Sequence, residues 1–143
     1  MAFVPMSELL SEAYAEGYAI PGFCVWGAEA VQTVMRVAEK LRAPVILMNG
    51  PAEFGMLSPT ALGAVAHALL PSYEVRAALL LDHGDSVARV EECLAAGYTS
   101  VMLDYSTRPL EENVAALREV VALAQPLGVT VEGELGVVGK ANA

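Results

Sequence analysis

The sequence contains few basic residues. Eight lysines and arginines stand against 17 aspartates and glutamates, so the formal net charge at pH 7 is −9. A protein that binds nucleic acid needs a basic surface that neutralises phosphates. The composition therefore argues against nucleic acid as a partner. It says little more, because acidic surfaces are common and keep proteins in solution.

Long apolar runs and a basic leader are missing as well. No apolar run approaches the roughly 20 residues that span a bilayer, and residues 1–5 lack the features of a signal peptide. The only two cysteines, Cys24 and Cys93, lie in apolar segments, which predicts buried free thiols rather than a disulfide. We therefore expect a cytoplasmic protein without a membrane partner.

The 143 residues, 55% of them hydrophobic and 17% charged, are enough for one packed domain. Short apolar runs alternate along the chain with amphipathic stretches. The apolar runs predict strands over residues 20–26, 44–49, 77–82, 100–104 and 129–134. The amphipathic stretches predict helices over 7–16 with Ser7 as N-cap, 28–41, 58–70, 85 or 86 to 96, and 109–125.

Alternating strands and helices form either a doubly wound sheet or a (β/α)8 barrel. No glycine-rich dinucleotide fingerprint follows the first strand, which weakens the first alternative. Polar residues follow several of the strands, and a barrel brings all strand ends into one ring; these residues are Asn49, Asp82, His83, Asp104, Ser106, Glu132 and Glu134. We therefore predict an α/β fold in which residues 1–143 form about the first five βα units of a single TIM-barrel domain.

The pair Asp82 and His83 is the strongest candidate for chemistry. It ends a buried apolar run and is followed by Gly84, so a carboxylate and an imidazole lie side by side at the edge of a sheet. The structural alternative is that Asp82 caps the next helix and His83 packs in a loop.

Carboxylates on the neighbouring strands favour the chemical interpretation. Residues two apart in a strand point to the same side, so Glu132 and Glu134 are expected on one face. Asp104 and Ser106 repeat this spacing on the strand between. Buried carboxylates are costly unless they are paired or bound to a cation. One imidazole with several carboxylates suits zinc or another transition metal.

Four segments resemble the class II, metal-dependent ketose-bisphosphate aldolases. They are LLDHGDS at 80–86, AGYTSVMLD at 96–104, LEENV at 110–114 and VEGELGVVG at 131–139. The resemblance spans the whole chain but only the first half of the family's sequence. It implies reversible retro-aldol cleavage of a ketose phosphate to an aldehyde and a triose phosphate of the dihydroxyacetone phosphate type.

The resemblance also implies residue roles. His83 matches the family's first ligand of Zn²⁺, or of another divalent metal. Asp82 matches the aspartate that moves the proton at the aldehyde oxygen. Asp104 and Glu134 match carboxylates that hold a second or displaced metal ion. Two further zinc histidines belong to later strands than those of this chain, and a mobile acidic loop would begin after residue 139. We expect three residues at the substrate rim, namely Asn49, Trp26 and Ser106.

Two positions depart from the family pattern. CVWG at 24–27 replaces the usual Asn-Val-Asn, and Tyr105 replaces the glycine of Asp-Gly-Ser. Bulky Trp26 and Tyr105 would reshape the pocket, which argues against a strict fructose or tagatose bisphosphate specificity and favours other sugar phosphates.

Two other interpretations stay open. One is a non-catalytic half-barrel that folds and self-associates through open edges near its first and fifth strands. The other is a flavodoxin-type binding module, which the lack of a phosphate-binding loop after the first strand disfavours. For the aldolase itself we expect a homo-oligomer, a dimer or tetramer, and no turnover by these 143 residues alone.

Overall fold

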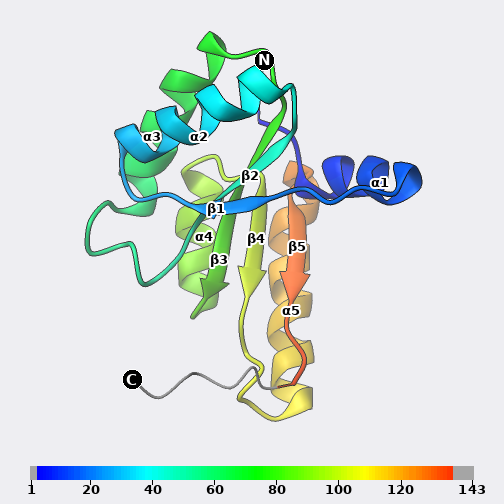
Figure 1. The fold of residues 1–143 in the computed structure, drawn as a ribbon. Coiled ribbons are helices and arrows are strands. Elements are labelled where there is room, and N and C mark those ends of the chain that lie inside the picture. Colours follow the sequence, from blue (N-terminus) through cyan, green and yellow to red (C-terminus); the bar gives the residue numbers. More distant parts are fainter. Residues whose placement is uncertain (1–2, 137–143) are drawn as a thin grey trace, which may run out of the picture.

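The computed structural model describes residues 3–136, which form one parallel sheet with flanking helices (Figure 1). Each strand pairs in parallel with the next, and the sheet order β1-β2-β3-β4-β5 follows the chain. This order confirms the predicted α/β fold with consecutive βα units. The elements are α1 (Met6–Glu16), β1 (Gly22–Cys24), α2 (Ala28–Leu41), β2 (Val45–Asn49), α3 (Pro59–Leu69), η1 (Leu70–Ser72), β3 (Ala77–Gly84), α4 (Val87–Ala95), β4 (Ser100–Leu103), α5 (Leu110–Ala124), η2 (Gln125–Leu127) and β5 (Thr130–Gly133).

Helices α2 to α5 pack on one face of the sheet and form the larger core with it. Alternate strand residues supply this face, because successive side chains of a strand point to opposite sides. They are Val45, Leu47, Leu79, Leu81, Val101 and Leu103, and each is buried. None of the helices within residues 3–136 has both the length and the apolar character needed to cross a membrane.

Helix α1 packs on the other face of the sheet, over its N-terminal end. Its Met6 and Leu9 contact the intervening strand residues, such as Ile46 and Leu80, in a second and smaller core. The segment that begins α1 also bonds to the first residues of β3, β4 and β5. Its three donors are the backbone N–H groups of residues 4, 6 and 7, which reach Ala77, Ser100 and Thr130.

The first helix and the first strand differ in detail from the sequence prediction. Helix α1 begins at Met6, one residue early, and Pro5 is its N-cap. Ser7 does not cap the helix, because its hydroxyl instead accepts a hydrogen bond from Thr130. Strand β1 covers only Gly22–Cys24 and is exposed at the edge of the sheet.

The two cysteines are both free, but only one of them is buried. Cys93 lies in α4 against the larger core, and burial raises the pKa of its thiol to about 12. Cys24 is exposed, so the prediction of a buried thiol is wrong at this position. Its apolar neighbours in the sequence belong to an edge strand, which other chain segments cover only partly.

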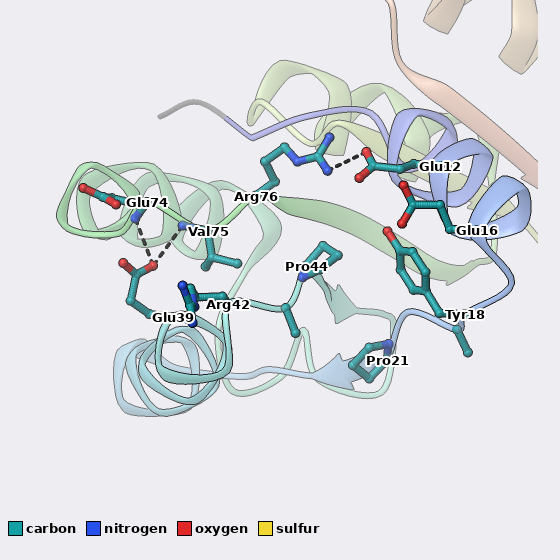
Figure 2. Close-up of a pocket in the computed structure, with 12 residues that line it drawn as sticks. Glu12, Glu16, Tyr18, Pro21, Glu39, Arg42, Pro44, Glu74, Val75 and Arg76 are labelled. Carbon is teal, nitrogen blue, oxygen red and sulfur yellow. Dashed lines mark hydrogen bonds and ion pairs between the residues drawn. The ribbon is translucent and has the colours of Figure 1, made fainter.

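A cleft of about 630 Å³ lies where the chain enters β1, β2 and β3 (Figure 2). Its polar groups make structural contacts. Arg76 forms a 2.6 Å ion pair with Glu12 of α1, and Glu39 of α2 accepts hydrogen bonds from the backbone N–H groups of Glu74 and Val75. These contacts hold helices α1 and α2 to the segment that leads into β3. The cleft lies at the N-terminal end of the strands, the end whose residues contribute to stability in parallel barrels.

Replacing a core leucine tests the assignment of the larger core. Leu47 is fully buried in the middle of β2, so Leu47→Ala should lower the free energy of unfolding by about 2–5 kcal/mol. The matched control is Leu127→Ala, because Leu127 is 62% exposed and its loss should change stability by less than about 0.5 kcal/mol. Urea denaturation followed by circular dichroism measures both values. Equal losses in the two variants would contradict the assignment.

Candidate metal centre

A β-bulge at the end of β3 determines the direction of the His83 side chain. Leu81 pairs with Val101 and Gly84 with Leu103, so two residues of β3 stand opposite one residue of β4. His83 has φ +48°, a left-handed conformation that costs energy for a residue with a side chain. Gly84 is required beside it, since a Cβ there would lie 2.6 Å from the carbonyl oxygen of Met102.

The bulge directs the imidazole of His83 at two carboxylates. Its Nδ1 lies 2.9 Å from Oδ2 of Asp104 and 3.4 Å from Oε2 of Glu134. An ionised carboxylate only accepts hydrogen bonds, so in the metal-free chain Nδ1 carries a proton. The pKa of His83 is raised, chiefly by this bond to Asp104, with further contributions from the charges of Asp82 and Glu134.

Asp104 is held by the turn that follows β4. The backbone N–H and the hydroxyl of Ser106 both donate to its Oδ1, at 3.1 and 2.6 Å. These bonds, together with the one from His83, lower the pKa of the carboxyl group. Asp104 therefore stays ionised, with Oδ2 left to face His83.

Glu134 is the residue directly after β5, and its carboxylate also faces His83. Its side chain is 16% exposed. Its backbone carbonyl oxygen accepts a 2.9 Å hydrogen bond from the side-chain amide of Asn113 in α5. The sequence analysis assigns no role to Asn113. The residue lies in the LEENV segment, where it is the one uncharged polar side chain among acidic and apolar residues, and this is the only signal that the sequence offers.

Three residues, His83, Asp104 and Glu134, together fit a divalent cation, and we call them the metal group. Their ligand atoms lie within 4.8 Å of one another, and each residue offers one imidazole nitrogen or carboxylate oxygen. Such a donor set suits zinc and similar transition metals. A cation bound among these atoms would take the place of the His83 proton.

Asp82 and Glu132 form a second acidic pair beside this group. Both line a hollow on the face of the sheet that packs against α1, next to Leu80 and Met48. Burial, and then the charge of Asp82, raises the pKa of Glu132. Glu132 and Glu134 therefore divide between two neighbouring groups instead of sharing one. The alternation of a strand stops at Gly133, so it does not determine where Glu134 points.

The structure places the predicted rim residues in different surroundings. Ser106 belongs to the metal group through Asp104, and Trp26 is 51% exposed just after β1. Asn49 is fully buried, and its amide bonds to the carbonyl of Val25 and the hydroxyl of Tyr98. Both polar ends of the Asn49 amide are therefore occupied within the core.

Tyr105 does not line the hollow on the α1 face of the sheet. Its ring packs against the larger core on the helical side of the sheet. The guanidinium of Arg108 lies over the ring, 3.8 Å from its centroid. Trp26 and Tyr105 are the two bulky residues that depart from the family pattern. Of these two, only Trp26 is exposed at the strand ends.

Comparison with known proteins identifies relatives of the chain. The family profile described as "Fructose-bisphosphate aldolase class-II" matches residues 4–143. A protein of Halalkalibacterium halodurans named "6-phospho-5-dehydro-2-deoxy-D-gluconate aldolase" is 38% identical over 97% of this chain and 49% of its own length. A "Probable fructose-bisphosphate aldolase" of Bacillus subtilis is 41% identical over 97% of this chain and 50% of its own.

A solved structure has the same fold. The crystal structure of the YdjI aldolase from Escherichia coli K12 superimposes with a TM-score of 0.89 at 31% identity. The superposition covers 98% of this chain and 53% of that chain. The chain therefore spans about half the length of the relatives that it matches.

Titration of His83 tests the geometry of the centre. We expect its pKa in the metal-free chain to lie above the ordinary histidine value, mainly because Asp104 accepts a hydrogen bond from its Nδ1. Folding raises this pKa, so the stability that the charged ring contributes is complete below the unfolded pKa and is lost as pH rises through the folded one. Asp104→Asn should shift the pKa back toward its ordinary value. NMR of the ring protons in the presence of a chelator measures the shift.

The control for this titration is Asp85→Asn. Asp85 is an exposed carboxylate close in sequence, but its hydrogen bond comes from the hydroxyl of Ser86. The control should leave the His83 titration in place. The same midpoint in wild type and in Asp104→Asn would refute the pairing.

Proposed function

The chain belongs to the class-II fructose-bisphosphate aldolase family, and we propose that it forms the metal-binding and proton-transferring half of a metal-dependent aldolase. The proposed reaction is the reversible cleavage of a ketose phosphate to an aldehyde and a triose phosphate of the dihydroxyacetone phosphate type. The observation that carries this proposal is the convergence of His83, Asp104 and Glu134 at the C-terminal ends of β3, β4 and β5. Barrel enzymes keep their chemistry at this end of the sheet.

The residues present fit a divalent ion such as Zn²⁺. His83 would supply an imidazole nitrogen, and Asp104 and Glu134 would each supply a carboxylate oxygen. When bound, such an ion supplies Lewis-acid chemistry that polarises the carbonyl of a substrate.

Asp82 is the proposed proton carrier. It adjoins His83 in the chain but lines the hollow on the α1 face of the sheet, so a substrate held at the metal centre can reach it. In the cleavage direction its carboxylate takes the proton of the hydroxyl group that becomes the aldehyde oxygen. The carbon–carbon bond then breaks, its electron pair stays with the fragment that becomes the triose phosphate, and that fragment takes up a proton from solvent. In the synthesis direction Asp82 returns the proton to the new hydroxyl group.

The substrate is proposed only as a class. Trp26 replaces a small polar residue of the family pattern and is half exposed at the end of β1. The two named relatives match this chain almost equally well, at 38% and 41% identity, yet their names give different substrates. Overall sequence similarity thus does not identify the sugar of the substrate. The bulky side chain of Trp26 favours ketose phosphates other than fructose or tagatose bisphosphate. A cytoplasmic location and self-association complete the proposal.

A second candidate function rests on the edges of the sheet. Strands β1 and β5 each pair with one neighbour in the described residues and present a free backbone edge. Free edges of this kind favour pairing with another chain. A half-barrel that self-associates without turnover is therefore the alternative.

A chimeric enzyme separates the two candidates. We expect residues 1–143, joined to the second half of the Bacillus subtilis relative, to cleave at least one of a panel of ketose phosphates in a coupled assay. A chelator should abolish this activity and Zn²⁺ should restore it. Asp82→Asn should lower kcat by roughly 10²–10⁴-fold with metal content unchanged, as expected for loss of a general base. The 143 residues alone should show no turnover.

The matched control for Asp82→Asn is Glu91→Gln, which removes an exposed carboxylate from α4. It should retain the activity of the chimera. A folded, metal-loaded chimera without activity on the panel would favour the half-barrel alternative. Full activity of Asp82→Asn would remove Asp82 from the proposed mechanism.

A further inference from the structure

Asn113 is a buried polar residue that contributes no atom to the metal group. It lies in the first turn of α5 and is 3% exposed. Its Nδ2 donates to the backbone carbonyl oxygen of Glu134 over 2.9 Å. Its Oδ1 is buried without a hydrogen-bond partner among the described residues.

The stability of the fold does not explain an asparagine at this position. The hydrogen bond to Glu134 is favourable, but a buried acceptor that has lost its water without gaining a partner is unfavourable. The two effects oppose each other, and an apolar residue of similar shape would avoid both. A role other than stability therefore accounts better for Asn113.

Glu134 needs a support that the sheet does not give. The pairing of β4 with β5 ends at Leu103 and Gly133, so Glu134 is the first residue beyond the ladder. Helix α5 lies directly against this end of the strand, because a Cβ on Gly133 would be 2.6 Å from Cδ1 of Leu117. Leu117 and Asn113 are one helical turn apart, so they lie on the same face of α5. This face therefore contacts both Gly133 and Glu134.

We propose that Asn113 is a positioning residue for the metal centre. By holding the backbone of Glu134 just beyond β5, it keeps Oε2 of that residue 3.4 Å from Nδ1 of His83. Asn113 would not touch the metal or the substrate. This inference rests on the proposed metal site and adds to it the residue that aligns one of its three ligands.

Cobalt binding to the 143-residue chain tests the proposal. Co²⁺ replaces Zn²⁺ in such donor sets, and its visible absorption reports the ligands. Asn113→Leu should weaken Co²⁺ binding about 10- to 100-fold, the range typical when a partner of a metal ligand is lost. It should leave the urea midpoint unchanged or raised, because it removes both the bond and the unpartnered oxygen. Asn113→Ala is the second variant if the leucine does not fit, and it should weaken binding to a similar extent.

The matched control is Tyr98→Phe. It removes another buried side-chain hydrogen bond, the one to Asn49, away from the metal group. This variant should lose stability and keep the Co²⁺ affinity of the wild type. A general loosening of the fold would instead weaken binding in both variants, and that result would overturn the positioning role.

A double-mutant cycle tests whether Asn113 acts through Glu134. Glu134→Gln alone should weaken Co²⁺ binding, and adding Asn113→Leu should weaken it no further. Wild-type affinity in both Asn113 variants, or an additive loss in the double variant, would refute the inference. His83→Ala keeps this test separate from the metal site itself. If His83→Ala binds Co²⁺ as the wild type does, the proposed centre fails; if it does not bind and Asn113→Leu binds normally, only the positioning role fails.

Discussion

The left-handed backbone at His83 is the constraint on which the rest of the site depends. An ordinary strand would send residues 82 and 83 to opposite faces of the sheet and would bury one of them against the helices. The bulge instead keeps Asp82 on the face that carries α1 and turns His83 along the strand ends, where Asp104 and Glu134 meet it. Gly84 makes the turn possible because a side chain there would strike the backbone of β4. The strained backbone at His83 is thus part of how the three candidate metal ligands are brought together.

The sequence was sufficient to predict the fold because the central strands of a parallel sheet are buried on both faces. Such strands leave uninterrupted apolar runs, as β2 and β3 do, and these runs were located to within a few residues. The errors fall where that condition fails. Strand β1 lies at an edge, so its extent and the burial of Cys24 were overestimated. The local sequence predicts Ser7 as a cap, and nothing in it shows that Thr130, far along the chain, donates a hydrogen bond to the Ser7 hydroxyl.

The site was harder to predict from the sequence than the fold, because a polar residue at the end of a strand does not show in which direction its side chain points. Asp82, His83 and Asp104 are predicted as site residues from their positions after apolar runs, and the structure brings them to one end of the sheet. Asn49 follows the same rule, but its amide is consumed by Val25 and Tyr98 in the core. The separation of Glu132 from Glu134 depends on the residue at which β5 ends, which sequence patterns locate poorly. The link from Asn113 to Glu134 joins a helix to the following strand, and no spacing rule encodes it.

The turn between Asp104 and Ser106 also limits how many oxygens the protein can offer to a cation. Ser106 donates twice to Oδ1, so Asp104 would offer a cation one oxygen, Oδ2. With one oxygen from Glu134 and one nitrogen from His83, the described residues give a coordination number of three. Calcium requires six to eight oxygen ligands, so this arrangement disfavours it. A cation held by these three donors would be one that about four ligands satisfy, with one position left for an exchangeable ligand. Ser106 would coordinate nothing itself, but it would shape this preference by occupying Oδ1 of Asp104 with hydrogen bonds.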